Sequence, residues 1–166
     1  MRRAEQIRYL ILAAQREGNR QLSAALAQLG LTPAQSEALR ILEDHGPLAL
    51  KQLGDMLVCD TGTSPSRIVD RLVAAGLVHR DAGEHDRRQV RLAVTQLGAE
   101  KSAQVRAIED QLYDAIDGAM NDSDTRVLLR VLLSLTNGSP AGTALENRLA
   151  AEQSPTSPSA HSARAK

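Results

Sequence analysis

The chain has no tryptophan and no phenylalanine, and Tyr9 and Tyr113 are its only tyrosines. A core without these large rings has to come from Leu, Ile, Val and Ala, which suits helices better than sheets. The single cysteine, Cys59, excludes an internal disulfide and a cysteine-based zinc site, and it favours a reducing, cytoplasmic setting. No apolar run is long enough for a signal peptide or a membrane span.

The charges of the chain balance, with 20 Lys and Arg residues against 20 Asp and Glu residues. Net charge therefore gives no indication of a nucleic-acid partner and excludes none, because binding depends on where the charges lie. A length of 166 residues is sufficient for one domain with a proper hydrophobic core.

Apolar periodicity predicts long helices on either side of a region of shorter elements. Residues 4–29 carry one helical face, with a weak point at Gly18 and Asn19. A second long helix is expected over residues 96–120, followed by an apolar helix that ends at Asn137. These terminal helices carry more apolar surface than one small lobe can bury.

The middle region begins with a strong helix start, because Thr32 can cap, Pro33 fits the first helical position and Gln35 completes a capping box. Ser64 as a cap and Pro65 at the first position open a later helix. The expected elements are helices at 33–44, 51–58 and 65–75, a short strand at 48–50, and a hairpin of residues 77–80 and 90–94. A hairpin directly after a helix-turn-helix is a winged helix.

The composition changes after Ser139, where Ala, Ser, Pro, Gly and Thr dominate. A brief helix is expected over residues 144–151. Residues 138–166 as a whole are expected to form a largely disordered tail, because they contain too little apolar surface to fold independently.

Residues 31–98 contain four short segments whose order and spacing are informative. They are LTPAQ at 31–35, GPLALKQL at 46–53, SRIVDRL at 66–72 before GLV at 76–78, and DRR at 86–88 before Val90, Leu92, Thr95 and Gly98. With these segments the chain resembles the MarR family of bacterial transcription regulators. The resemblance covers residues 4–137, since the flanking long helices resemble the family's dimerisation region.

The resemblance implies a mainly α fold, a winged helix-turn-helix with a two-stranded β wing and long N- and C-terminal dimerisation helices. Residues 31–95 would form the DNA-binding lobe, and residues 1–30 and 96–137 the dimerisation region. The implied function is that of a homodimeric transcription regulator, expected to be a repressor, on a pseudo-palindromic operator in double-stranded DNA. No cofactor and no membrane partner are expected.

The helix over residues 65–75 is the usual reader of the major groove in such a fold. Ser64, Ser66 and Arg67 lie at its start, and Asp70 and Arg71 lie about one turn further along. Arg67 could bind guanine through two hydrogen bonds or hold a phosphate. The alternative is a solvated helix face that contains an ion pair.

The tip of the hairpin is the second candidate DNA contact. In the family, the arginine two places after an aspartate enters the minor groove and the aspartate orients it, roles that fall on Arg88 and Asp86. Arg80, Arg87 and Arg91 are expected to contact phosphates. The alternative is a charged tip that keeps the hairpin soluble. Neighbouring acids nearly cancel these cations, so moderate non-specific affinity is expected.

Candidate sensing residues are less sharply defined. The family often binds small phenolic or anionic effectors between the DNA-binding lobe and the dimer helices, and Tyr9, His45, His79 and Tyr113 could border such a crevice. Ordinary structural roles are the alternative for each. Cys59, in the turn of the helix-turn-helix, is a candidate redox sensor, and the alternative is a small buried apolar side chain.

Other function classes have weaker support in the sequence. A winged helix used only for protein interaction would not need the arginines of the helix and the wing. An enzyme with Cys59 as nucleophile would need a histidine base that the sequence does not place, and there is no glycine-rich phosphate loop. His79, His85 and Asp86 lack the firm spacing of metal ligands. We therefore expect no enzymatic activity.

Overall fold

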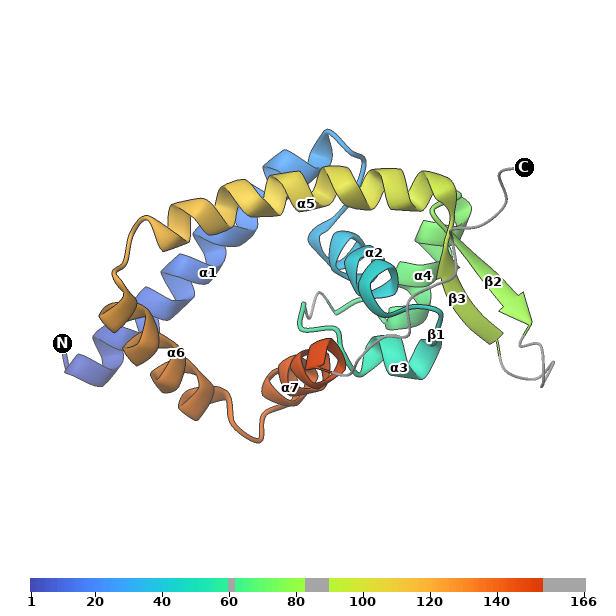
Figure 1. Cartoon of the computed structure of the whole chain (residues 1–166). Coiled ribbons are helices and arrows are strands. Elements are labelled where there is room, and N and C mark those ends of the chain that lie inside the picture. The colour runs from blue at the N-terminus through green and yellow to red at the C-terminus, as the bar shows by residue number, and fades with distance from the viewer. Residues whose placement is uncertain (60–61, 83–89, 154–166) are drawn as a thin grey trace.

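The computed structural model describes residues 1–59, 62–82 and 90–153, and it is mainly helical (Figure 1). Its elements are α1 (Arg3–Ala27), α2 (Pro33–His45), β1 (Leu48–Ala49), α3 (Leu50–Gly54), α4 (Pro65–Ala74), β2 (Val78–Ala82), β3 (Val90–Val94), α5 (Gln96–Asp117), α6 (Asp122–Thr136) and α7 (Pro140–Gln153). This order confirms the winged helix-turn-helix with long flanking helices.

Helix α2 begins at the predicted capping box. The Thr32 hydroxyl accepts a hydrogen bond from the Gln35 amide at 3.3 Å, and the Gln35 side chain accepts one from the Thr32 amide at 2.9 Å. Nearly every side of α2 is covered by other elements, so Ala38, Leu39 and Ile41 are fully buried. Helix α2 is therefore the central support of the lobe.

The core of the lobe forms where α2, α4, the sheet and the start of α5 meet. Its fully buried hydrophobic side chains are aliphatic, as the composition requires, and include Leu39, Leu53, Leu72, Leu92 and Val105. Burying a side chain of this size stabilises the fold by about 1.5–3 kcal/mol. The core thus fixes the positions of both α4 and the wing.

The wing is a β2–β3 hairpin to which β1 adds a short third strand, in the order β1-β3-β2. Its antiparallel register pairs Val78 with Val94 and Ala82 with Val90. The hairpin packs very closely against the start of α5, since a Cβ at Gly98 would collide with the carbonyl oxygen of Leu77. Glycine is required at this position because the two backbones approach so closely.

The terminal helices extend away from the lobe. Helix α1 runs unbroken through the expected weak point at Gly18, and its N-terminal part and α6 both lie at the end of the molecule away from the wing (Figure 1). Helix α5 ends at Asp117, three residues before the expected end. Asn121 then begins α6 by accepting hydrogen bonds from the Ser123 and Asp124 amides at 2.9 and 3.0 Å.

The segment after α6 corrects one expectation. Helix α7 covers Pro140–Gln153, which is longer than the brief helix expected within a largely disordered tail. The reason is tertiary, since Gly142 and Ala144 are buried and the Asn147 side chain donates a hydrogen bond to the Asp55 carbonyl oxygen at 2.9 Å. Residues 154–166 lie outside the described part of the chain.

No helix in the described part of the chain is both long and apolar enough to cross a membrane.

Candidate nucleic-acid interface

Helix α4 has one buried face and one open face. Ile68, Val69 and Leu72 are buried in the core, so the remaining positions are turned outward. The open face carries the residues predicted to read DNA, and all of them are exposed: Ser64, Ser66, Arg67, Asp70 and Arg71. The structure therefore brings the five predicted recognition residues together on one surface.

The start of α4 differs in one detail from the prediction. Pro65 occupies the first helical position, and Ser64 has the extended backbone of a cap residue. Its side chain makes no capping hydrogen bond; the Ser64 and Ser66 hydroxyls are instead hydrogen-bonded to each other at 3.0 Å. The Arg67 and Ile68 amides donate hydrogen bonds to the Ser64 carbonyl oxygen at 3.0 and 3.2 Å, and Pro65 has no N–H, so a phosphate at this helix start would be attracted mainly by the positive end of the helix dipole.

The side chains of the two α4 arginines have no partner in the described part of the chain, where the guanidinium groups of Arg67 and Arg71 make no hydrogen bond and no ion pair. Asp70 is paired, but with Arg80 of β2, at 2.5 Å. The ion pair expected on this face therefore joins α4 to the wing and leaves both α4 arginines uncompensated. An uncompensated cation on an exposed face is suited to bind a phosphate or a guanine edge.

The described part of the wing holds two of the expected phosphate contacts. Arg80 is occupied by Asp70, and Arg91 donates a hydrogen bond to the carbonyl oxygen of Pro47 at 3.3 Å. Both side chains remain exposed, so these contacts orient the guanidinium groups without burying them. The predicted tip residues Asp86, Arg87 and Arg88 lie outside the described residues.

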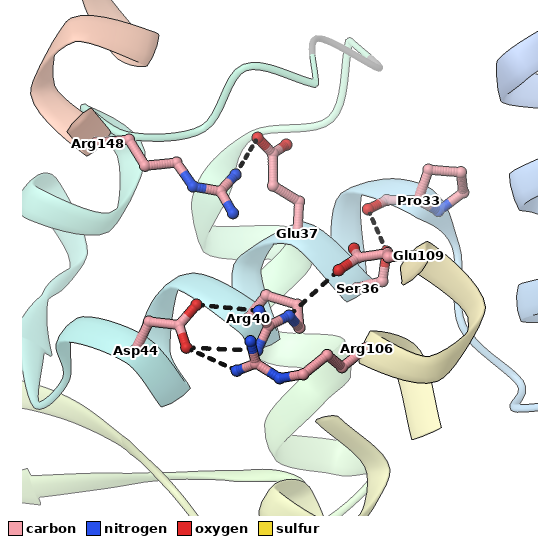
Figure 2. A network of polar contacts seen from close by, with 8 residues as sticks. All are labelled: Pro33, Ser36, Glu37, Arg40, Asp44, Arg106, Glu109 and Arg148. Atoms are coloured by element: carbon pink, nitrogen blue, oxygen red, sulfur yellow. Dashed lines mark hydrogen bonds and ion pairs between the residues drawn. The ribbon is translucent and has the colours of Figure 1, made fainter. Parts of the chain in front are cut away.

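Glu37 of α2 supports the turn that leads into α4. Its two carboxylate oxygens accept hydrogen bonds from the Val58 and Cys59 amides at 2.9 and 2.8 Å. Arg148 of α7 lies 3.7 Å from the same carboxylate (Figure 2). A charged acceptor for two adjacent amides is a strong constraint, so Glu37 fixes the backbone just before the recognition helix.

A second group of charges joins α2 to α5. The Arg40 side chain is only 8% exposed, and its guanidinium lies 3.2 Å from both Glu109 and Asp44. Arg106 of α5 also bonds Asp44, at 3.0 Å (Figure 2). These residues, Arg40, Asp44, Arg106 and Glu109, form what we call the α2–α5 charge network. It ties the lobe to the long helix that leaves it.

Burial changes the acid–base behaviour of three groups near these contacts. Burial raises the pKa of Glu109, although the Arg40 guanidinium opposes the shift. Burial, together with the negative charge of Glu37, raises the pKa of the Cys59 thiol to about 11. The pKa of Tyr113 is raised by burial and by the neighbouring Glu109. The Cys59 thiol is therefore protonated near neutral pH.

The predicted effector residues are spread over the molecule. Tyr9 lies on α1, where Arg8 sits 5.1 Å from its ring centre, and Tyr113 lies on α5. His45 ends α2, while His79 lies on β2 and contacts Asp81 at 3.0 Å. None of these four residues contributes to the lining of the cavity between the helix-turn-helix and α7, or to that of the smaller cavity between α1 and α5. The structure does not gather them into one pocket.

Sequence reasoning missed the residues that support the site, above all Glu37, Arg40 and Arg148. A signal for Arg40 was present, since it interrupts the apolar run from Ala38 to Leu42. A charged residue on a buried helix face normally has a partner. Its partner Glu109 is 69 residues away, which no local pattern indicates.

The geometry indicates a class of protein: a winged helix that presents arginines on the open face of its second motif helix is typical of DNA-binding transcription regulators. Residues 31–90 match the model of the MarR family. The organic hydroperoxide resistance transcriptional regulator of Bacillus subtilis is 33% identical over 99 residues, 60% of this chain and 67% of that protein. The regulator FarR of Neisseria gonorrhoeae is 31% identical over 114 residues, 69% of this chain and 77% of that protein.

A solved structure agrees with these sequence matches. The Staphylococcus aureus MepR–DNA complex has a TM-score of 0.70 with this chain at 19% identity, and the match covers 76% of this chain and 93% of that one. At this identity the likeness shows the fold alone. The two sequence relatives and the family match establish the family: the chain belongs to the MarR family of transcription regulators.

Proposed function

We propose that the chain is a sequence-specific repressor that acts as a homodimer on a pseudo-palindromic operator in double-stranded DNA. The observation that carries this proposal is the open face of α4, where Arg67 and Arg71 have no partner among the described residues. The MepR chain, which shares the fold, was solved with DNA. In this proposal Ser64, Ser66 and Arg67 contact base edges or phosphates at the start of α4, and Asp70 and Arg71 flank them.

The wing would bind beside the recognition helix. Arg88 would enter the minor groove with Asp86 as its orienting partner, while Arg80, Arg87 and Arg91 would contact phosphates. The register supports this proposal, since β2 and β3 pair through Ala82 and Val90 and the tip residues connect these two positions. In this arrangement residues 31–95 form the DNA-binding lobe.

The homodimer follows from apolar surface that one chain leaves uncovered. Among the described residues α6 has no buried side chain, and Leu129 and Leu135 are 56% and 61% exposed. Ile7 and Leu10 of α1 are exposed to a similar degree. Such an extended apolar surface marks an interaction site, and a two-fold dimer would place two α4 helices about one DNA turn apart. Residues 1–30 and 96–137 would form this interface.

A small effector, phenolic or anionic, would release the repressor by favouring a spacing of the two lobes that misses the half-sites. The name of the Bacillus subtilis relative links that protein to organic hydroperoxides. Cys59 is the only thiol that could serve a comparable role here, and its raised pKa weighs against it.

Selection from a random duplex library tests the proposal, with Arg88→Ala processed beside the unmodified chain. Enrichment of one inverted repeat, with weaker enrichment by the variant, is the expected result. Half-sites recovered singly would contradict the dimer. Failure to enrich any sequence at low salt would contradict DNA binding and would favour a protein-interaction module instead.

A further inference from the structure

A cavity of about 810 Å³ lies between the helix-turn-helix and α7. One wall is formed by the end of α3, the following turn and the start of α4, and includes Leu57, Pro65 and Ile68. The other is formed by the α6–α7 connection and α7, and includes Ser139 and Thr143. Pockets of about 300–1,000 Å³ are typical of small-molecule sites.

Specific contacts hold the two walls together. Asn147 of α7 bonds the Asp55 carbonyl oxygen at 2.9 Å, and Arg148 lies 3.7 Å from Glu37. Ala144, between the connection and these contacts, is 7% exposed. The cavity is therefore bounded by docked elements on both sides, and its floor is the inner face of the recognition helix.

The chemistry of the lining is neutral and mostly apolar. Leu57, Val58 and Ile68 contribute aliphatic surface, and the hydroxyl and amide groups of Thr63, Thr143 and Asn147 can form hydrogen bonds. Among the described lining residues Asp55 is the only one with a charged side chain, and none is a cation. Cys59 also lines the cavity and carries a protonated thiol near neutral pH.

We propose that this cavity binds an uncharged, mainly apolar small molecule that carries a hydroxyl or carbonyl group. An anion would lose hydration without meeting a cation among the described lining residues, and it would lie near the carboxylate of Asp55. The apolar wall and the scattered neutral donors suit a molecule with one polar end. This ligand class differs from the phenolic or anionic effectors considered for the crevice beside the dimer helices.

An occupant of the cavity also affects α4. It would contact Pro65 and Ile68, the first residues of the recognition helix that face inward, and it would contact α7, which follows α6 after a short connection. Because an occupant in contact with the start of α4 restricts the movement of this helix, we expect it to lower DNA affinity. This coupling rests on the proposed function, whereas binding of the ligand does not.

Cys59 allows a direct test, because it is the only cysteine and it lines the cavity. The rate of its alkylation by N-ethylmaleimide is measured by mass spectrometry at mildly alkaline pH on the full chain. Three probes with the same ring system are compared: 2-naphthylmethanol, 2-naphthoate and 2-naphthylmethylammonium. At about ten times its dissociation constant, the neutral alcohol is expected to slow alkylation about tenfold, and the two ions are expected to have little effect.

Two variants show where the probe binds. Ala141 is exposed and lines the cavity, so Ala141→Phe places a ring in the cavity and should abolish protection by the alcohol. Ala103→Phe is the control and should retain protection, because Ala103 is exposed on α5 and does not line the cavity. Equal or better protection by either ion would overturn the proposed ligand class. A thiol that reacts only after unfolding would show that the cavity is closed to small molecules, and would overturn the site.

The DNA readout separates the two levels of the proposal. With the selected operator, 2-naphthylmethanol is expected to raise the dissociation constant of the unmodified chain and not that of Ala141→Phe. Full protection of Cys59 with unchanged DNA affinity would keep the site and overturn its coupling to α4. Protection of Cys59 in a chain that selects no DNA would contradict the proposed function alone.

Discussion

The guanidinium of Arg40 on α2 donates a hydrogen bond from Nε to the carboxylate of Glu109 on α5 at 3.2 Å, with the arginine side chain almost fully buried. Removing one partner of a buried ion pair leaves an uncompensated charge, which costs about 3–5 kcal/mol. We expect Arg40→Met to lower the free energy of unfolding by about 3 kcal/mol, since Asp44 and Glu109 lose their shared cation.

Urea unfolding at one fixed protein concentration measures this loss. The double variant Arg40→Met with Glu109→Leu should recover part of this loss of stability, because the carboxylate that would be left without a cation is removed together with the arginine. Arg20→Met is the control, since the Arg20–Glu17 pair is exposed to solvent and should contribute little to stability. Equal losses for Arg40→Met and Arg20→Met would contradict a stabilising role for the α2–α5 charge network.

Glu37 should matter more for DNA binding than its distance from the recognition surface suggests. Glu37→Ala leaves the amides of Val58 and Cys59 without their acceptor, so the turn before α4 becomes less ordered. We expect operator affinity to fall about tenfold, equivalent to about 1.4 kcal/mol. Glu43→Ala, at an exposed position of the same helix, should retain affinity in the same titration. Glu37→Gln should be intermediate, because its amide oxygen can replace only one of the two acceptors.

The local elements around this site could be predicted from the sequence because their signals are local. The capping box at Thr32 and Gln35 begins α2 as expected, and Pro65 marks the first position of α4. The change of period after Gly76 predicts the hairpin. Gly76 itself has a left-handed backbone, with φ +71°, and this conformation, which favours glycine, follows the end of α4. In these cases one short segment contains all the information.

The supporting contacts could not be predicted, because their partners are distant in the sequence. Glu37 bonds amides 21 and 22 residues away, and the Asn147–Asp55 contact spans 92 residues. Helix α7 is longer than predicted for the same reason, since Asn147 bonds the Asp55 carbonyl oxygen and Gly142 packs against Thr136 of α6. Tertiary packing here outweighs local propensity.

Arg67 should contribute both affinity and specificity. A bidentate contact with guanine is worth about 1–3 kcal/mol of discrimination against other bases. We expect Arg67→Ala to weaken binding to the selected operator by this amount and to relax the preference at one position of each half-site. Arg16→Ala, which removes the same charge from an exposed position of α1, should change neither. A uniform loss across all sequences, with a shallower salt dependence, would instead assign Arg67 to a phosphate.

The proposed dimer predicts a strong effect of charge on the exposed apolar face of α6. Leu129→Asp places a carboxylate on this face in each chain, so we expect the dimer to dissociate in sedimentation velocity runs and operator affinity to fall with it. Leu149→Asp is a matched control, since Leu149 is 41% exposed on α7, outside the proposed interface. A monomeric unmodified chain at micromolar concentration would contradict the dimer before any variant is needed.

Cys59 should resist oxidation. Its pKa of about 11 exceeds the ordinary value of 9.0, so near neutral pH the reactive thiolate is about a hundredfold rarer than in an unperturbed thiol. Titration by thiolate absorbance, with Cys59→Ser as blank, should show this raised value in the folded chain only.

The same shift sets a pH dependence of stability. Between about pH 9 and 11 the folded chain keeps a proton that the unfolded chain releases, so the free energy of unfolding falls as pH rises through this window. Cys59→Ser should lack that component of the decline. Operator affinity should be unchanged after peroxide treatment of the unmodified chain. A thiol that ionises below pH 9, together with peroxide-dependent loss of DNA binding, would instead make Cys59 a redox sensor.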